Sequence, residues 1–144
     1  MSAQNIPQEL VGKWLIKRDL PTRTICGWGE KETHAILGTE IEYTADSFRW
    51  KDIVVKNPTV ELTVVTAEQF QRDNSSPSVK GSQVSFRQLG INTVKVKQVG
   101  INHEPAKITG ATTEIPGDVV LLKDRSTIIF SVCNVYFEAK RLRP

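Results

Sequence analysis

The chain has 144 residues and a mass of 16.1 kDa, with 39% hydrophobic and 24% charged residues. This is the size of one ordinary globular domain, and the composition excludes disorder, collagen or coiled-coil repeats and a disulfide-dense miniprotein. The net charge of +3 is spread along the chain, so nucleic acid is not expected as a partner. We therefore expect residues 1–144 to form a single domain, with residues 1–9 as a flexible N-terminal segment.

No part of the sequence approaches the roughly 18 to 20 consecutive apolar residues that a membrane-spanning helix requires. The chain begins without the basic and apolar regions of a signal peptide. We therefore expect either that it carries no targeting signal or that Met1 replaces a signal peptide that was removed. The two cysteines, Cys26 and Cys133, fit either one disulfide in an oxidising compartment or two buried thiols. The two cysteines slightly favour an exported protein, and we expect a periplasmic or secreted location.

Hydrophobic residues recur with a period of two along most of the chain, which is typical of half-buried strands. The first such segment, 11–18, places Gly12, Trp14 and Ile16 on one face. Further strands are expected, in chain order, at 40–44, 47–56, 59–66, 82–89, 93–101, 118–122, 127–132 and 135–142. Within 47–56, Lys51-Asp52 interrupts the alternation and indicates a bulge or bend.

Helix is expected only in two short segments. Residues 30–37 contain helix formers and stop at Gly38, while 67–73 follow Thr66, which with Gln69 reads as a capping box. About eight to ten short antiparallel strands in one chain must form a sandwich or a closed barrel, because an open sheet would expose two long edges. The predicted fold class is therefore all-β, with one or two short helices.

Gly12-x-Trp14 near the start of the fold and Arg141 near its end resemble the lipocalins and the wider calycin superfamily. The segments 37–48 and 135–141 are similar to a group of small exported bacterial lipocalin-like proteins of unestablished role. The resemblance implies a single antiparallel calycin-like barrel in which Arg141 stacks on Trp14 where the first and last strands meet. A guanidinium over an indole is attracted by about 0.5 to 2 kcal/mol.

No sequence pattern for catalysis, for a metal or for a cofactor is present. The only histidines, His34 and His103, lack partners at metal-ligand spacing, and no nucleophile signature occurs. The carboxylates Glu40, Glu42 and Asp46 are candidates for general acid-base catalysis because they are close in sequence. However, Glu40 and Glu42 alternate with apolar residues, as solvated side chains do.

Aromatic residues on the strands suggest a cavity for a small hydrophobic molecule. Trp28 lies between two glycines in a loop that we expect at the barrel mouth. Ligand cavities are typically lined by such rings. The residues predicted to contact a ligand are Trp28, Tyr43, Phe48, Trp50 and Phe86.

Three functions follow from this interpretation. The first is non-enzymatic binding of a small hydrophobic or amphipathic molecule inside the barrel. The alternative is a protein-binding module such as an inhibitor of a secreted hydrolase, in which case the barrel would be packed solid. The third is a small barrel enzyme that uses Tyr43 or a carboxylate. Cys26 and Cys133 lie in loops that could meet, so a disulfide between them is a further expectation.

Overall fold

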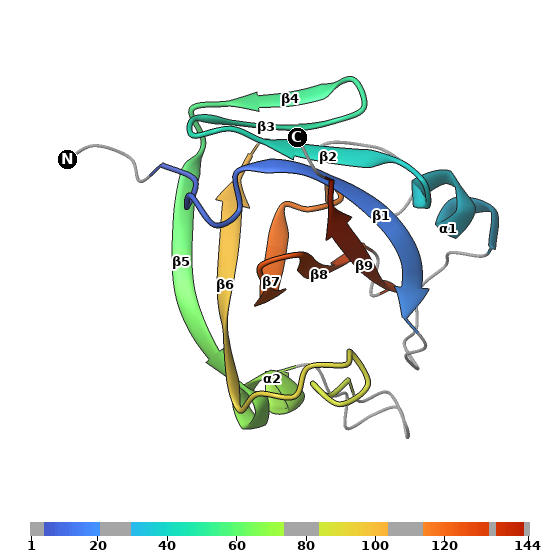
Figure 1. The fold of residues 1–144 in the computed structure, drawn as a ribbon, viewed down its shortest axis with the longest axis vertical. Helices are drawn as coiled ribbons and strands as arrows, with labels where there is room; N and C mark the ends of the chain where they lie inside the picture. The colour runs from blue at the N-terminus through green and yellow to red at the C-terminus, as the bar shows by residue number, and fades with distance from the viewer. Residues whose placement is uncertain (1–4, 21–29, 74–83, 104–113, 133–134, 143–144) are drawn as a thin grey trace.

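The computed structural model describes residues 5–20, 30–73, 84–103, 114–132 and 135–142. Nine strands in this part of the chain form one antiparallel sheet with the order β4-β3-β2-β1-β9-β8-β7-β6-β5. The sheet curls so that β1 to β4 lie across β6 to β9, which gives a half-barrel (Figure 1). The all-β fold predicted from the sequence is confirmed. The strands are β1 (Gly12–Leu20), β2 (Glu40–Tyr43), β3 (Ser47–Trp50), β4 (Ile53–Lys56), β5 (Thr59–Thr66), β6 (Lys95–Asn102), β7 (Val119–Asp124), β8 (Thr127–Val132) and β9 (Val135–Arg141).

Strand β1, the first strand, pairs with β9, the last strand. It pairs with β2 on one side and with β9 on the other, and Trp14 lies directly opposite Arg141. The alternation in β1 places Trp14 and Ile16, both fully buried, towards the inside of the half-barrel. The two ends of the curled sheet, β4 and β5, follow each other in the chain without pairing.

Two sequence-based expectations are corrected by the topology. Residues 47–56 form two strands rather than one bulged strand, because the chain reverses at Lys51 and β3 pairs with β4. Lys51 adopts a φ of 51°, which a tight turn requires and which no glycine signals in the sequence. Of the strand expected at 82–89, the described residues 84–89 form no strand although their apolar residues alternate, and residues 86–90 form a turn.

Two short helices complete the described elements. Helix α1 (Glu30–Ile36) is followed by Gly38, whose φ of 81° is the left-handed conformation that ends a helix. Helix α2 (Ala67–Asp73) begins where the Gln69 amide donates a hydrogen bond of 3.1 Å to the Thr66 hydroxyl, as the capping pattern predicts. No helix in the described ranges is long and apolar enough to span a membrane.

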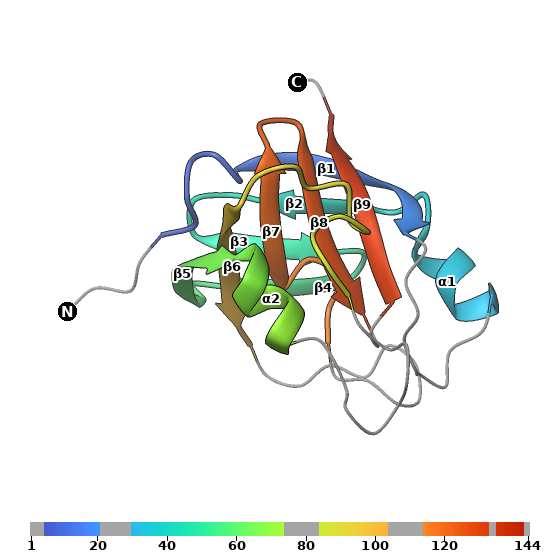
Figure 2. The ribbon, with the colours of Figure 1, turned by 90° about the horizontal axis from the view of Figure 1, so that it is seen from below.

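The sheet separates two hydrophobic cores. The interior core lies inside the half-barrel, and five of its aromatic side chains are at most 2% exposed: Trp14, Tyr43, Phe48, Phe130 and Phe137. The outer core lies on the other face of β6 to β9, where α2 and residues 84–91 cover the sheet (Figure 2). Successive residues of one strand therefore serve different cores, as Ile128 and Ile129 of β8 do.

The segment before β1 packs against the sheet. Ile6 is 3% exposed, Leu10 is fully buried, and both belong to the interior core. The Ile6 amide also donates a 3.0 Å hydrogen bond to the carbonyl of Ala45. From residue 5 onward, the expected flexible N-terminal segment is therefore part of the folded domain.

Candidate functional site

The contact predicted between Trp14 and Arg141 is present. The guanidinium carbon of Arg141 lies 4.2 Å from the centroid of the indole ring, and the indole N–H donates a 2.9 Å hydrogen bond to the Leu10 carbonyl. Arg141 also donates to the main-chain carbonyls of Glu9, Val11 and Arg125. This cluster ties the segment before β1 to the strand pair β1–β9, which is a structural role.

Three of the predicted ligand contacts lie in the interior core. Tyr43 and Phe48 stack on each other with their ring centroids 5.2 Å apart, and both side chains are almost completely buried. Trp50 is 5% exposed, and its indole N–H donates to the Thr39 hydroxyl at 2.9 Å. Beside them, Phe130 and Phe137 stack at 5.6 Å. A ligand inside the half-barrel would have to displace these contacts.

The remaining predicted site residues are separated from this group. Phe86 lies in the outer core, where its ring centroid is 5.2 Å from that of Phe70 on α2. It is therefore on the other side of the sheet from Tyr43 and Phe48. Trp28 and the two cysteines, Cys26 and Cys133, lie outside the described residues.

A buried polar turn, which no sequence pattern indicated, precedes β7. The Asp118 carboxylate accepts a hydrogen bond from the Ile115 amide (3.1 Å) and lies 2.8 Å from His103 Nε2. The Tyr43 hydroxyl donates to the Gly117 carbonyl at 2.6 Å. Burial raises the pKa of Asp118, although its hydrogen bonds to His103 and Ile115 act in the opposite direction. His103 and Asp118 are 15 positions apart in the sequence, so no short motif indicates that they interact.

Burial also raises the pKa of Tyr43 well above 10.0, and the charge of Asp118 adds to this shift. The phenol therefore stays protonated and acts as a hydrogen-bond donor to the turn. Among the described residues, no group of three histidine, cysteine or carboxylate side chains could hold a metal ion. The arrangement holds the turn at residues 115–118 against Tyr43 and His103.

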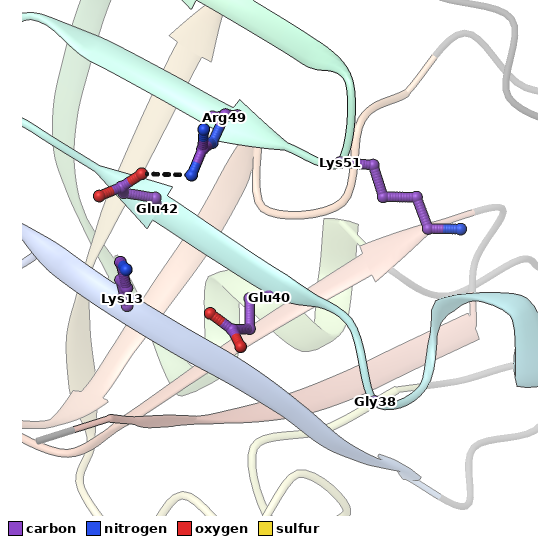
Figure 3. Close-up of a pocket in the computed structure, with 6 residues that line it drawn as sticks. All are labelled: Lys13, Gly38, Glu40, Glu42, Arg49 and Lys51. Atoms are coloured by element: carbon purple, nitrogen blue, oxygen red, sulfur yellow. Dashed lines mark hydrogen bonds and ion pairs between the residues drawn. The ribbon is translucent and has the colours of Figure 1, made fainter.

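A polar hollow lies on the outside of β1, β2 and β3 (Figure 3) and is the candidate binding site. It has a volume of about 250 Å³. Lys13, Glu42 and Arg49 stand opposite one another in a cross-strand row, and Arg49 is paired with Glu42 at 2.8 Å. The residues that line it are Lys13, Gly38, Glu40, Glu42, Arg49 and Lys51.

Three charges in this hollow have no opposite charge within 4.0 Å in the described part of the chain: the ammonium groups of Lys13 and Lys51 and the carboxylate of Glu40. The row continues to Val54 on β4, which lies opposite Arg49 and is 49% exposed. We call the outer side chains Lys13, Glu40, Glu42, Arg49 and Val54 the recognition face. Glu40 and Glu42 were expected on a solvated face, which agrees with their position on the outside.

Fold and site together define a small all-β protein with a curled antiparallel sheet and a core of buried aromatic side chains among the described residues. Comparison with models of known protein families, with curated proteins and with solved structures finds no match to this chain.

Proposed function

We propose that the protein is a non-enzymatic protein-binding module, the second of the functions considered from the sequence. The packing of the interior core is the observation that carries this proposal. All six of its aromatic side chains in the described residues are at most 5% exposed, whereas a carrier for small hydrophobic molecules needs an apolar space of several hundred Å³. The hollow at the recognition face is instead external and charged.

Charged and apolar side chains lie together on the recognition face, as they do at the polar rim of a protein interface. It combines one exposed apolar side chain, Val54, with charges of both signs. Lys13 and Glu40 are free to pair with opposite charges of a partner, which favours one orientation of binding and excludes partners with like charges. The outer face of β6 to β9 is not a candidate binding surface, because α2 and residues 84–91 cover it.

The proposal extends to family and location. The Gly12, Trp14 and Arg141 cluster supports a calycin-like barrel, and the cysteine usage supports a periplasmic or secreted protein. In such a compartment a secreted hydrolase is a suitable partner. The small-ligand hypothesis stays a prediction, and the experiment below tests both.

The test measures binding of purified secreted hydrolases to the immobilised protein and, in parallel, native mass spectrometry of the protein for a co-purifying small molecule. We expect one or more hydrolases to bind and Glu40→Lys to weaken that binding by at least about tenfold, because it places a like charge in the contact. Glu68→Lys is the matched control, since Glu68 is an exposed glutamate on α2, away from the recognition face and outside β5.

The proposal fails if no hydrolase binds and a hydrophobic molecule is found in the protein instead. It also fails if fatty acids or retinoids quench tryptophan fluorescence saturably with no response to Glu40→Lys. Either outcome would support the small-ligand hypothesis.

A further inference from the structure

Strand β5 leaves one edge of the sheet without a neighbour. All eight of its residues pair with β6, from Thr59 opposite Asn102 to Thr66 opposite Lys95. In the described part of the chain, no strand pairs with its other edge. The outward N–H and C=O groups of alternate residues can therefore pair with a further strand.

Two of the exposed side chains on β5 are apolar, and the others are threonines and Glu61. Leu62 and Val64 point to the same face as buried Val60, towards the inside of the half-barrel, yet they are 46% and 57% exposed. Leu62 stands directly opposite fully buried Val99 on β6. The row of apolar side chains that begins in the interior core therefore continues to the free edge of β5, where Leu62 and Val64 are exposed to solvent.

This edge also lacks the usual protection of an edge strand, namely lysine, proline or a very short strand. Strand β4, at the other end of the sheet, has that protection: it is four residues long and ends in Lys56. Strand β5 is twice as long, and its only charged residue is Glu61. Of the two free edges, β5 is the one suited to pairing.

The sequence of β5 is complementary to itself. In an antiparallel pair of two copies centred on Leu62, the two Leu62 side chains meet and Val60 lies opposite Val64 of the second copy. On the other face Glu61 lies opposite Thr63 of the second copy, so no like charges are opposed. A register centred on Glu61 would oppose two carboxylates and is disfavoured. We propose that two copies of the protein associate through β5 in the Leu62-centred register and form one continuous sheet.

The first test is the molecular mass in solution, measured by sedimentation equilibrium over a concentration series. We expect a dimer of twice 16.1 kDa, and at least about tenfold weaker dimerisation for Leu62→Lys, because two ammonium groups would meet at the centre of the pair. Val119→Lys is the matched control: Val119 is also 46% exposed but lies on β7, away from the edge. Circular dichroism verifies that both variants are folded.

The second test fixes the register in a background with Cys26 and Cys133 replaced by serine. Residues directly opposite in an antiparallel pair have Cα atoms about 4.5 to 5.5 Å apart, which a disulfide can bridge. Leu62→Cys should therefore form a disulfide between copies on oxidation. Thr63→Cys should not, since its counterpart in the second copy is shifted by two residues, about 7 Å along the strand.

A protein that stays monomeric throughout the series, or a dimer that Leu62→Lys leaves unchanged, overturns the proposal. Equal crosslinking of Leu62→Cys and Thr63→Cys overturns the register. The result is independent of the proposed recognition face, because Glu40→Lys should not affect dimerisation. Failure of either proposal can therefore be distinguished from failure of the other.

Discussion

Position 12 is where a side chain would disturb the contact between Arg141 and Trp14. A Cβ atom on Gly12 would lie 2.8 Å from a terminal nitrogen of Arg141, and the φ of 136° is one that other residues rarely adopt. The guanidinium cannot swing away without cost, because it also donates to three carbonyls. Both effects make glycine the fitting residue at this point.

Gly12→Ala should therefore lower the free energy of unfolding by about 1 to 3 kcal/mol through backbone strain and the displaced guanidinium. Gly100→Ala is the control, since Gly100 on β6 has no heavy atom within 4 Å of the added methyl group. We expect that variant to be as stable as the parent or more stable, by up to about 1 kcal/mol. Urea unfolding measures both, and equal effects would contradict the role of Gly12.

Trp14 contributes more than the cation-π contact. Its side chain is fully buried in the interior core and bonded to the Leu10 carbonyl. Trp14→Ala should cost about 3 to 5 kcal/mol, as truncation of a buried aromatic does. Thermal unfolding checks this, with the exposed Val54→Ala as a reference for a change on the surface. A melting temperature close to that of the parent would show that Trp14 does not hold the β1–β9 pair together.

Among the elements, the strands were predicted from the sequence more reliably than their connections. The period of two places Trp14, Ile41 and Phe48 on the inside because burial on one face imposes it, whatever partner the strand has. The reversal at Lys51 was not predictable, since the usual Asn-Gly or Asp-Gly signal is missing. Residues 84–90 alternate as a strand does, but Phe86 is buried by Phe70 of α2 rather than by a neighbouring strand.

The candidate site was predictable only in part. The pair of Trp14 and Arg141 was accessible because it resembles a known arrangement, whereas His103 and Asp118 come together only through the β6–β7 pairing. The face to which Phe86 belongs depended on α2 folding back over the sheet, which the local sequence does not encode. The recognition face needed the cross-strand order, since Lys13 and Glu42 are far apart in sequence but directly opposite in the sheet.

The turn before β7 predicts a pH dependence. Burial raises the folded-state pKa of Asp118 above 3.8, so the folded protein binds this proton more tightly than the unfolded chain. The stability that this group contributes is complete below about pH 3.8 and is lost as the pH rises through the folded-state pKa. Asp118→Asn removes the titration. The unfolding free energy of the parent relative to the variant should therefore fall as the pH increases from 4.

Urea unfolding of both proteins between about pH 4 and pH 7 measures this difference, and the range covers ordinary carboxyl titration. A difference that stays constant, or one that grows with pH, would show that the Asp118 carboxyl is not desolvated in the folded protein. The variant keeps an acceptor for the Ile115 amide, so loss of the turn itself is not expected.

For the whole molecule, the two tyrosines report on the two cores. Tyr43 lies in the interior core and Tyr136 in the outer core, and the sequence contains no other tyrosine. Burial raises the pKa of Tyr43 well above 10.0 and that of Tyr136 to about 12. At pH 11 the folded protein should show little tyrosinate absorbance, whereas the chain in urea should titrate near 10. Since the unfolded chain loses these protons first, stability should fall as the pH rises above 10.

An absorbance titration at 295 nm checks this, with Tyr136→Phe assigning each step. Ionisation of one tyrosine near pH 10 in the folded protein would mean that its core is open to water.

The position of β9 has a consequence for the order of folding. Strand β9 is the last of the nine along the chain but lies in the middle of the sheet, between β1 and β8. Until it is synthesised, a nascent chain can form only two separate meanders, β1 to β4 and β5 to β8, each with an unsatisfied edge. Joining them requires contacts such as Arg141 with Val11, 130 residues apart, which folding theory associates with slow closure. During that interval the β9 of one chain can fill the gap in another, so exchange of this strand is the misfolding route that crowded synthesis favours.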